Sequence, residues 1–260
     1  MGFWDLMIQK DDLICSIINS AFKLIHKLNI KEQNLLRKMA NRKFDFAHNE
    51  IFIVLNSPSL QRQDLSVLQG KTLMFVNRGF YHPLYKELQP RFHTFIDPKM
   101  LNGKWPVTWL DEILELSPNV TFIMPVTWAS KKQFRPYIER GVSFYWMPIQ
   151  AVCDCLGVAG ECFQFAIKQN IPTIYFTGFE ASGIAYELIK TTSHFYGANE
   201  ENLKKSTKDQ VIDLLMHSRH LHDLNRFAKM SKAKGISVIN LTEGGLLDMF
   251  PRMNLKEIGV

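Results

Sequence analysis

Short apolar runs recur along most of the chain, and most end at a polar or turn-forming residue. Between several of them lie segments in which apolar residues repeat every three or four positions, as on one face of a helix. Strands that alternate with helices are typical of a mainly parallel sheet with helices on both faces. We therefore expect one α/β domain over residues 49–260, with helices at about 159–169 and 208–229. The predicted strands are Ile51–Leu55, Thr72–Val76, Phe92–Ile96, Val120–Met124, Val142–Met147, Thr173–Thr177 and Ser237–Leu241.

The first 48 residues have a different pattern, which predicts a separate amphipathic helical segment. Apolar residues recur at helical spacing from Ile14 to Leu28, after Asp11 and Asp12, and acidic residues stabilise a helix N-terminus. The range Lys23–Lys43 holds seven Lys or Arg residues and one Glu, which predicts a helical hairpin with a basic face. We expect this segment to cap the α/β domain or a second subunit. Docking to an anionic membrane face is the alternative.

Composition and charge exclude several classes of protein. Hydrophobic residues make up 46% of the chain and charged residues 22%, which excludes disordered and fibrous architectures. No apolar stretch approaches the roughly 20 residues of a membrane-spanning helix, and the acidic start does not fit a signal peptide. We therefore expect a cytoplasmic protein. The net charge of +6 favours an anionic partner, such as nucleic acid, a nucleotide-linked substrate or an anionic membrane surface.

Two clusters match metal-binding patterns only in part. The first cluster consists of Cys153, Cys155 and Cys162. It has no second cysteine pair and no nearby histidine, so we expect small buried side chains and not a zinc site. The second is "MHSRHLHD", in which His217 and His220 share a helix face but His222 does not. Three ligands would meet poorly there, and we expect a solvated or partner-facing basic helix instead.

Short polar side chains follow four of the predicted strands. In open parallel sheets ligands bind beyond the carboxyl ends of the strands, where such side chains meet at one edge. Asparagine and aspartate also form turns, so a single position carries little information, whereas the repetition favours a ligand site. The four positions are Asn56 in "IFIVLNSPSL", Asn77 in "TLMFVN", Asp97 in "FHTFID" and Glu180 after "IYFTGF".

Residues 159–197 hold a second group of polar positions. Ala159 and Gly160 open a predicted helix, whose N-terminus is suited to a phosphate because its N–H groups and dipole attract anions. The following strand delivers Gly178, Glu180 and Ser182 to the same edge. His194 lies in a short turn between aromatic residues, and an imidazole is the natural general base near neutral pH. From spacing alone, a structural histidine is the alternative for His194.

These motifs, in this order, resemble the bacterial sialyltransferases that extend cell-surface oligosaccharides. More loosely they resemble a superfamily that includes motility-associated flagellin glycosyltransferases and 6-hydroxymethylpterin diphosphokinases. The family turn Gly-Asn-Gly-Pro-Ser-Leu corresponds to Leu55–Leu60, and its next two strand ends correspond to Asn77 and Asp97-Pro98. Later family motifs correspond to Ala159-Gly160, Gly178-Phe179-Glu180, Tyr186, Ser193-His194-Phe195-Tyr196-Gly197 and "INLTEGGLLDMF". The resemblance covers about residues 50–250.

The resemblance implies a Rossmann-like, GT-A-like fold and an inverting, metal-independent transfer from a nucleotide-activated sugar in bacterial surface-polysaccharide synthesis. A nucleotide would lie along Asn56, Ser57, Asn77 and Asp97, and its phosphate near Gly160. His194 would take the proton of the acceptor hydroxyl, while Tyr186 and Ser182 would meet the departing phosphate. The family serine is Ala159 here, its first phosphate-binding tyrosine is Ser182, and an arginine is absent. These departures weaken the implication of a sialic acid donor, and they leave another acidic or CMP-linked sugar, or a different nucleotide sugar, as alternatives.

The expected partners are a nucleotide-sugar donor and a glycan or lipid-linked acceptor, with no nucleic acid and no further cofactor. We also expect a homo-oligomer. The alternative for the N-terminal helices is contact with the inner face of the membrane. One competing function is a diphosphotransferase, which would require Mg²⁺ held by carboxylates such as Asp97 and Glu180. Another is a nucleotide-binding protein without catalysis, because the family arginine and tyrosine are missing.

Overall fold

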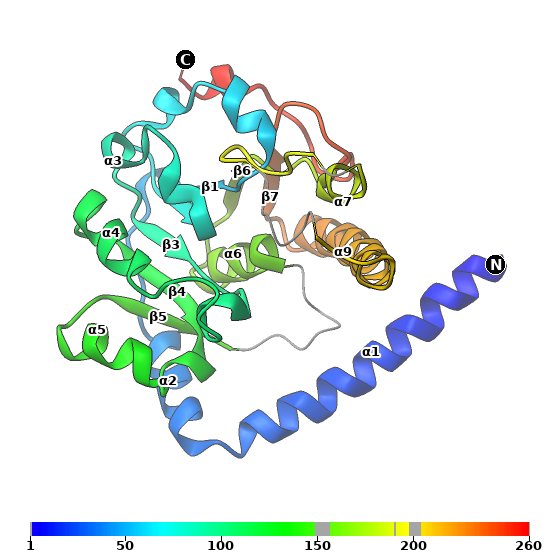
Figure 1. The fold of residues 1–260 in the computed structure, drawn as a ribbon, viewed down its shortest axis with the longest axis horizontal. Helices are drawn as coiled ribbons and strands as arrows, with labels where there is room; N and C mark the ends of the chain where they lie inside the picture. Colours follow the sequence, from blue (N-terminus) through cyan, green and yellow to red (C-terminus); the bar gives the residue numbers. More distant parts are fainter. Residues whose placement is uncertain (1, 149–156, 190, 198–203, 260) are drawn as a thin grey trace.

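The body of the molecule is a parallel seven-stranded sheet with the order β5-β4-β3-β2-β1-β6-β7 (Figure 1). The computed structural model describes residues 2–148, 157–189, 191–197 and 204–259. All seven predicted strands are confirmed, with ends that move by no more than two residues. The strands are β1 (Glu50–Val54), β2 (Leu73–Val76), β3 (Phe92–Thr94), β4 (Thr121–Pro125), β5 (Phe144–Met147), β6 (Thr173–Thr177) and β7 (Ser237–Asn240).

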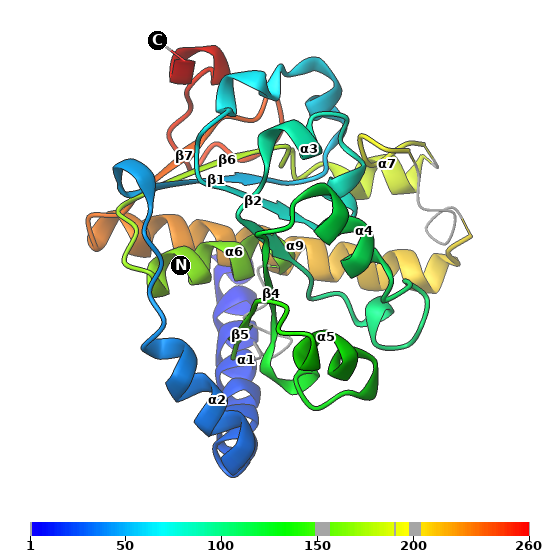
Figure 2. The same cartoon turned by 90° about the vertical axis from the view of Figure 1, so that its left-hand side faces the viewer.

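Helices cover both faces of the sheet, as the alternating pattern predicts. One face carries α6 (Gly157–Lys168) and α9 (Thr207–Ala233), and the other carries α3 (Tyr85–Leu88) with short 3₁₀ helices (Figure 2). Apolar strands are buried on both sides in such a fold, and every residue from Ile51 to Leu55 is indeed buried. The other helices of the α/β domain are α4 (Trp109–Leu116), α5 (Arg135–Glu139) and α7 (Gly183–Leu188).

The N-terminal segment forms two helices, α1 (Phe3–Lys27) and α2 (Ile30–Ala40). The side chain of Asn29 caps α2 by accepting a hydrogen bond from the Glu32 N–H. The predicted start of the first helix after Asp11 and Asp12 is wrong, because α1 begins at Phe3 and both aspartates lie within it. Their charges are matched by Arg219 of α9 and not by a helix terminus. The segment predicted to be helical is therefore longer and is joined to the body by ion pairs.

None of the described helices is both long enough and apolar enough to cross a membrane.

Two of the cysteines considered for a zinc site, Cys153 and Cys155, lie outside the described residues. Cys162 is buried in α6, and burial raises the pKa of its thiol to about 12. A protonated, inaccessible thiol agrees with the interpretation of Cys162 as a small apolar side chain.

Candidate functional site

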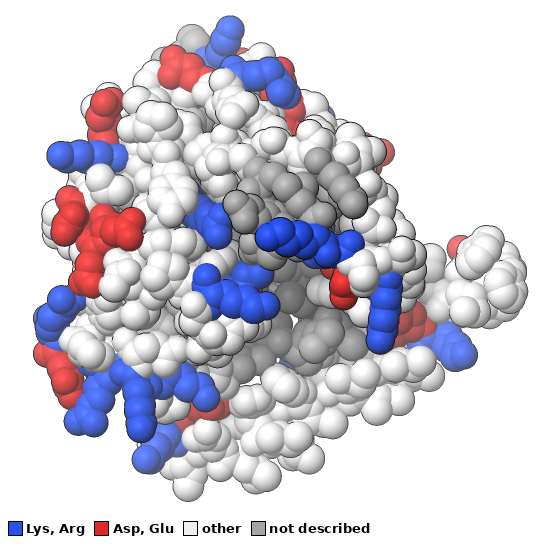
Figure 3. Space-filling model, viewed as in Figure 1, with Lys and Arg blue, Asp and Glu red and all other residues white. Residues whose placement is uncertain are grey.

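A cleft opens at the carboxyl edge of the sheet, between the ends of β1 and β6. The chain order reverses at this point, because β2 to β5 lie on one side of β1 whereas β6 and β7 lie on the other. Ligands in open parallel sheets bind at such reversals. The inner cavity measures about 360 Å³, and an adjoining cavity of about 980 Å³ shares part of its wall. Figure 3 shows this hollowed face of the molecule, with Lys and Arg side chains around the hollow.

The inner cavity brings together six of the eleven predicted site residues, which are Asn56, Ser57, Asn77, Ala159, Gly178 and His194. They come from three strand ends, from the first turn of α6 and from the loop at 193–197. Asp97 lines the adjoining cavity, where it accepts a hydrogen bond from the Lys99 N–H at 2.9 Å. Gly160, Glu180, Ser182 and Tyr186 line neither cavity.

The turn after β1 holds the site together through its backbone and the Asn56 side chain. Asn56 Nδ2 donates to the Val76 carbonyl at 3.1 Å, and the Ser57 N–H donates to the Gly178 carbonyl at 2.9 Å. The Phe195 N–H donates to the Asn56 carbonyl at 3.0 Å. One short turn therefore links the ends of β1, β2 and β6 to the loop that carries His194.

Two buried oxygens in the cavity wall have unused hydrogen-bonding capacity. Asn56 Oδ1 and Asn77 Oδ1 accept no hydrogen bond from the described residues. A buried acceptor without a partner costs about 1–3 kcal/mol, so native proteins rarely keep one without a reason. Both oxygens are enclosed by protein atoms, so a donor group of a bound molecule would reach them only after a shift of the wall.

Gly178, at the end of β6, is required by close packing. Its φ is +67°, a conformation that disfavours side chains, and an added Cβ would lie 2.8 Å from the Leu55 carbonyl oxygen and from Leu60 Cγ. No alternative rotamer relieves the contact with the carbonyl. The glycine therefore lets β6 pass close to the turn after β1.

Glu180 occupies a structural position beside the cleft. It is buried, and its Oε1 accepts the Ser59 N–H at 2.6 Å. Its Oε2 accepts the hydroxyls of Ser182 at 3.0 Å and Tyr186 at 3.1 Å. The arrangement directs both hydroxyls to Glu180, and their predicted role at a phosphate stays a prediction. The sequence did not reveal this network, because Ser59 lies 121 residues away from Glu180.

His194 is held at the cavity wall by aromatic packing. Its ring stacks on Tyr196 with a centroid distance of 4.9 Å and an interplanar angle of 19°. The guanidinium of Arg78 lies over Tyr196 at 5.7 Å and also over Trp105 and Trp109, at 5.6 and 5.3 Å. Cation–π contacts of this kind stabilise the loop that positions the imidazole. The role of Arg78 could not be predicted from the sequence, since its partners lie on two distant segments, at 105–109 and at 196.

The N-terminus of α6 contributes the anion-attracting part of the wall. Gly157 and Val158 line both cavities, and the helix begins there, two residues before the predicted start at Ala159. Three lysines line the adjoining cavity or both cavities, namely Lys99, Lys104 and Lys205. Lys205 pairs with Asp213 at 2.6 Å and Lys99 with Asp97 at 3.8 Å, so the helix N-terminus is the main feature that favours a phosphate or carboxylate in the cleft.

The α9 helix supplies a wall that the sequence did not assign to the site. Its side chains in the inner cavity are Asp213, Met216, His217, His220, Leu221 and Leu224. Burial, and to a lesser degree the neighbouring His217, lowers the pKa of His220, which is therefore neutral at pH 7. His222 instead contacts Asp12 of α1 at 3.1 Å. The sequence spacing correctly placed His222 on a different face of α9 from His217 and His220, but it did not reveal which face of α9 lines the cleft.

The described residues contain no group of three or more His, Cys, Asp or Glu side chains arranged to hold a metal ion. Glu180 and Asp97, the two carboxylates considered for Mg²⁺, do not line a common cavity.

Comparisons with known proteins add one structural similarity. No family model and no curated protein matches the sequence. The structure of the MAf glycosyltransferase from Magnetospirillum magneticum AMB-1 aligns with a TM-score of 0.48 and 11% sequence identity. The alignment covers 86% of this chain, which spans only 38% of that protein. The resemblance to the sialyltransferases noted in the sequence therefore stays a prediction, and the function is inferred from the cleft.

Proposed function

We propose that this protein is an inverting glycosyltransferase that transfers a sugar from a nucleotide-activated donor, with a CMP-linked sugar favoured, to a glycan or lipid-linked acceptor. The observation that carries the proposal is the convergence of Asn56, Asn77 and His194 on one cavity beside the N-terminus of α6. Such a cavity combines acceptors for a nucleoside, an attraction for phosphate and a base. The resemblance of the motifs to sialyltransferases supports the same reaction.

The donor would lie with its nucleoside against β1 and β2 and its phosphate toward α6. The side chains of Asn56, Ser57 and Asn77 would face the base and ribose. The α6 N-terminus would stabilise the phosphate by charge-assisted hydrogen bonds, and Lys205 would add to this by exchanging its ion pair with Asp213 for one with the phosphate. These groups also stabilise the negative charge that develops on the phosphate as it departs.

His194 would act as the general base. Its imidazole takes the proton of the acceptor hydroxyl while that oxygen attacks the anomeric carbon. The bond from the anomeric carbon to the phosphate oxygen breaks at the opposite side, so the nucleotide leaves with the bonding electron pair and the configuration inverts. A positioned base of this type contributes a factor of about 10²–10⁴ to the rate.

Nucleotide binding without catalysis is the second candidate, and one observation favours it. The two hydroxyls expected at the departing phosphate, Ser182 and Tyr186, donate to Glu180. The diphosphotransferase alternative depends on Asp97 and Glu180 acting together, and their separate positions do not favour it.

The experiment combines ligand screening with a histidine variant. Thermal shifts with CMP, UDP, GDP and ATP identify the nucleotide, because a ligand at a hundred times its Kd stabilises by about 2.7 kcal/mol. Transfer from the matching nucleotide sugar is then measured with and without EDTA. Full transfer in EDTA supports the proposal, whereas its abolition supports the diphosphotransferase.

His194→Ala should lower turnover at least about a hundredfold while nucleotide binding is kept. His48→Asn is the matched control, since His48 is exposed just before the amino end of β1 and its φ of +55° suits asparagine. Near-normal turnover of His194→Ala would remove this residue from the mechanism. Specific nucleotide binding with no transfer to any acceptor tested would favour the non-catalytic candidate.

A further inference from the structure

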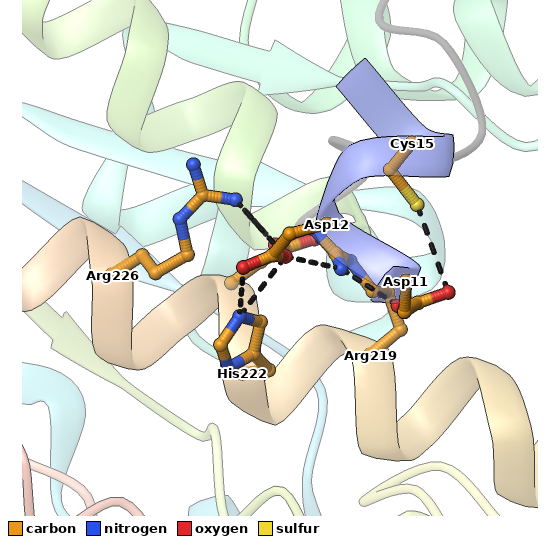
Figure 4. Close-up of polar contacts among 7 residues, drawn as sticks. Asp11, Asp12, Cys15, Arg219, His222 and Arg226 are labelled. Carbon is orange, nitrogen blue, oxygen red and sulfur yellow. Dashed lines mark hydrogen bonds and ion pairs between the residues drawn. The ribbon is translucent and has the colours of Figure 1, made fainter. Parts of the chain in front are cut away.

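Helix α1 contacts the body of the protein through its polar side. Arg219 of α9 donates hydrogen bonds to Asp11 at 2.8 Å and to Asp12 at 2.7 Å (Figure 4). It also pairs with Asp223 of its own helix at 2.8 Å. Burial acts to raise the pKa of Asp12, but the hydrogen bonds and charges of Arg219 and His222 outweigh it and lower that pKa. Cys15 and Asn19, one and two turns further along α1, are buried. The α1 residues at this contact, Asp11, Asp12, Cys15 and Asn19, are therefore charged, polar or small.

The apolar side of the same helix faces away from the protein. Ile17 follows Cys15 by two residues, about 200° around the helix, and is 61% exposed whereas Cys15 is 6% exposed. The apolar stripe of α1 consists of Phe3, Leu6, Met7, Leu13, Ile14, Ile17, Ile18, Leu24, Ile25 and Leu28, all of which are exposed. Figures 1 and 2 show α1 on the outside of the molecule, with its N-terminal end projecting beyond α9. The apolar stripe does not pack on the α/β domain of the same chain, and packing on a second subunit stays a prediction.

A contiguous exposed stripe of this size marks an interaction surface. The helix has 25 residues and is about 37 Å long, so the stripe runs along most of one side of an extended rod. Amphipathic helices with this outward orientation lie in the plane of a membrane interface when basic residues accompany the apolar face. The charge beside the stripe and the width of the stripe indicate whether its partner is a lipid surface or a second copy of the chain.

The charge at the C-terminal end of the stripe is positive, whereas α1 itself holds three Lys and three Asp residues and has no net charge. Residues 23–43 hold seven Lys or Arg and one Glu, a net charge of +6, which equals the net charge of the whole chain. Lys23, Lys27 and Lys31 in this range are exposed at the junction of α1 and α2. A basic segment beside an exposed apolar helix is complementary to anionic phospholipids.

The width of the stripe disfavours a paired coiled coil. In a two-stranded coil the positions that flank the apolar seam are usually charged. Here both flanks are partly apolar, with Leu6 and Leu13 before Ser20 and Lys27 on one side, and Ile18 and Ile25 after Asp11 on the other. Lys10 lies at a seam position, where a second helix would bury its charge, whereas at a lipid surface a lysine extends its ammonium group to the headgroups. We propose that α1 lies in the interface of an anionic membrane, with its apolar stripe in the lipid and its polar side on α9.

The first test is flotation of the full-length protein with vesicles, in the absence of nucleotide and acceptor. We expect binding to phosphatidylcholine vesicles that contain about 30% phosphatidylglycerol and at least tenfold weaker binding to phosphatidylcholine alone, because each basic side chain near an anionic surface strengthens binding roughly fivefold. No substrate is present, so failure here does not bear on the proposed glycosyltransferase reaction. Equal binding to both vesicles would contradict the electrostatic part of the proposal.

Matched variants of neighbouring residues separate the stripe from the rest of the helix. Ile17→Gln, alone or with Leu24→Gln, should weaken vesicle binding, at least tenfold in the double variant, whereas Ser16→Gln, about 100° around the helix from Ile17, should leave it nearly unchanged. All three side chains are exposed, so none of these changes should alter folding, which circular dichroism checks. Equal losses in Ile17→Gln and Ser16→Gln, or no binding by the unmodified protein, would overturn the proposal. Light scattering provides a further test. A dimer that only the Ile17→Gln, Leu24→Gln variant converts to a monomer would also overturn the proposal, because a second copy of the chain would then cover the stripe.

A tryptophan placed in the stripe provides a direct readout of insertion. Trp4 is 75% exposed but lies seven residues before Asp11, outside the stripe, and the other four tryptophans, at positions 105, 109, 128 and 146, are buried. In a variant that combines Trp4→Phe with Ile17→Trp, vesicles with brominated acyl chains should therefore quench the exposed tryptophan of the stripe. Absence of quenching in this variant at vesicle concentrations that give flotation would show that α1 does not enter the lipid.

Discussion

His93 links the stability of the protein to pH at a point directly beneath the candidate site. It lies in β3 and is fully buried, with Nε2 2.8 Å from the Asn77 carbonyl oxygen and Nδ1 2.9 Å from the Tyr85 hydroxyl. A carbonyl only accepts, so Nε2 carries the proton and Nδ1 accepts from Tyr85. Burial lowers the pKa of His93 from 6.5 to about 3, although the hydrogen bond to Asn77 acts in the opposite direction.

The sign of the effect follows from which state binds the proton. Below pH 6.5 the unfolded chain protonates this histidine, whereas the folded protein does so only near pH 3, so the free energy of unfolding falls as the pH falls. One pKa unit corresponds to about 1.4 kcal/mol, and between pH 7 and pH 5 His93 alone should remove about 2 kcal/mol. The loss of unfolding free energy at pH 5 is the same for any pKa of His93 below about 4 in the folded protein. His82 and His220, whose pKa values burial also lowers, add losses of the same sign.

The assay is urea unfolding at pH 7 and pH 5 for the unmodified protein and for His93→Gln. Glutamine can retain both hydrogen bonds but does not titrate, so the loss of unfolding free energy between the two pH values should be smaller in the variant by about 2 kcal/mol. If the variant is too unstable to measure, the imidazole C–H resonances of the unmodified protein provide the same information, because the His93 signal should not shift between pH 7 and pH 5. An equal pH dependence in both proteins, or a His93 resonance that titrates near pH 6.5, would refute this reasoning.

Glu180→Gln and Tyr186→Phe should show a coupling of about 1 kcal/mol in a double-mutant cycle of urea unfolding, because their side chains share a hydrogen bond of 3.1 Å. Strictly additive losses would show that Tyr186 does not depend on Glu180. Gly178→Ala should destabilise the protein by about 1–3 kcal/mol more than Gly103→Ala, since both glycines have positive φ but only Gly178 would bring a Cβ against Leu55 and Leu60. Equal losses of unfolding free energy in the two alanine variants would mean that the close packing is relieved at little cost.

The strands and the edge of the sheet that carries the cleft could be predicted from the sequence because both depend on local patterns. A run such as Ile51–Leu55 is apolar at every position, and only a strand buried on both faces suits it. The polar residues after β1 and β2 meet because parallel strands end at the same edge, which brings Asn56 and Asn77 into one cavity. Each inference required only neighbouring residues and the general geometry of a parallel sheet.

The roles of Glu180, Arg78 and His220 could not be predicted in the same way. Each depends on partners that are distant in the sequence, such as Ser59 for Glu180 and the aromatic rings at 105, 109 and 196 for Arg78. The spacing of His217 and His220 placed them on one side of a helix, but only the packing of α9 turned that side toward the cleft.

The sequence by itself determined the α/β architecture, the seven strands and an amphipathic N-terminal helix, because hydrophobic periodicity depends only on residues that are close together in the sequence. Only the tertiary structure decided which neighbours each side meets. It directed Ser182 and Tyr186 to Glu180, brought α9 into the cleft wall, and attached α1 through Asp11 and Asp12 so that its apolar stripe faces outward. The physical reason is that periodicity fixes which residues share a face, whereas long-range ion pairs and packing fix where that face points.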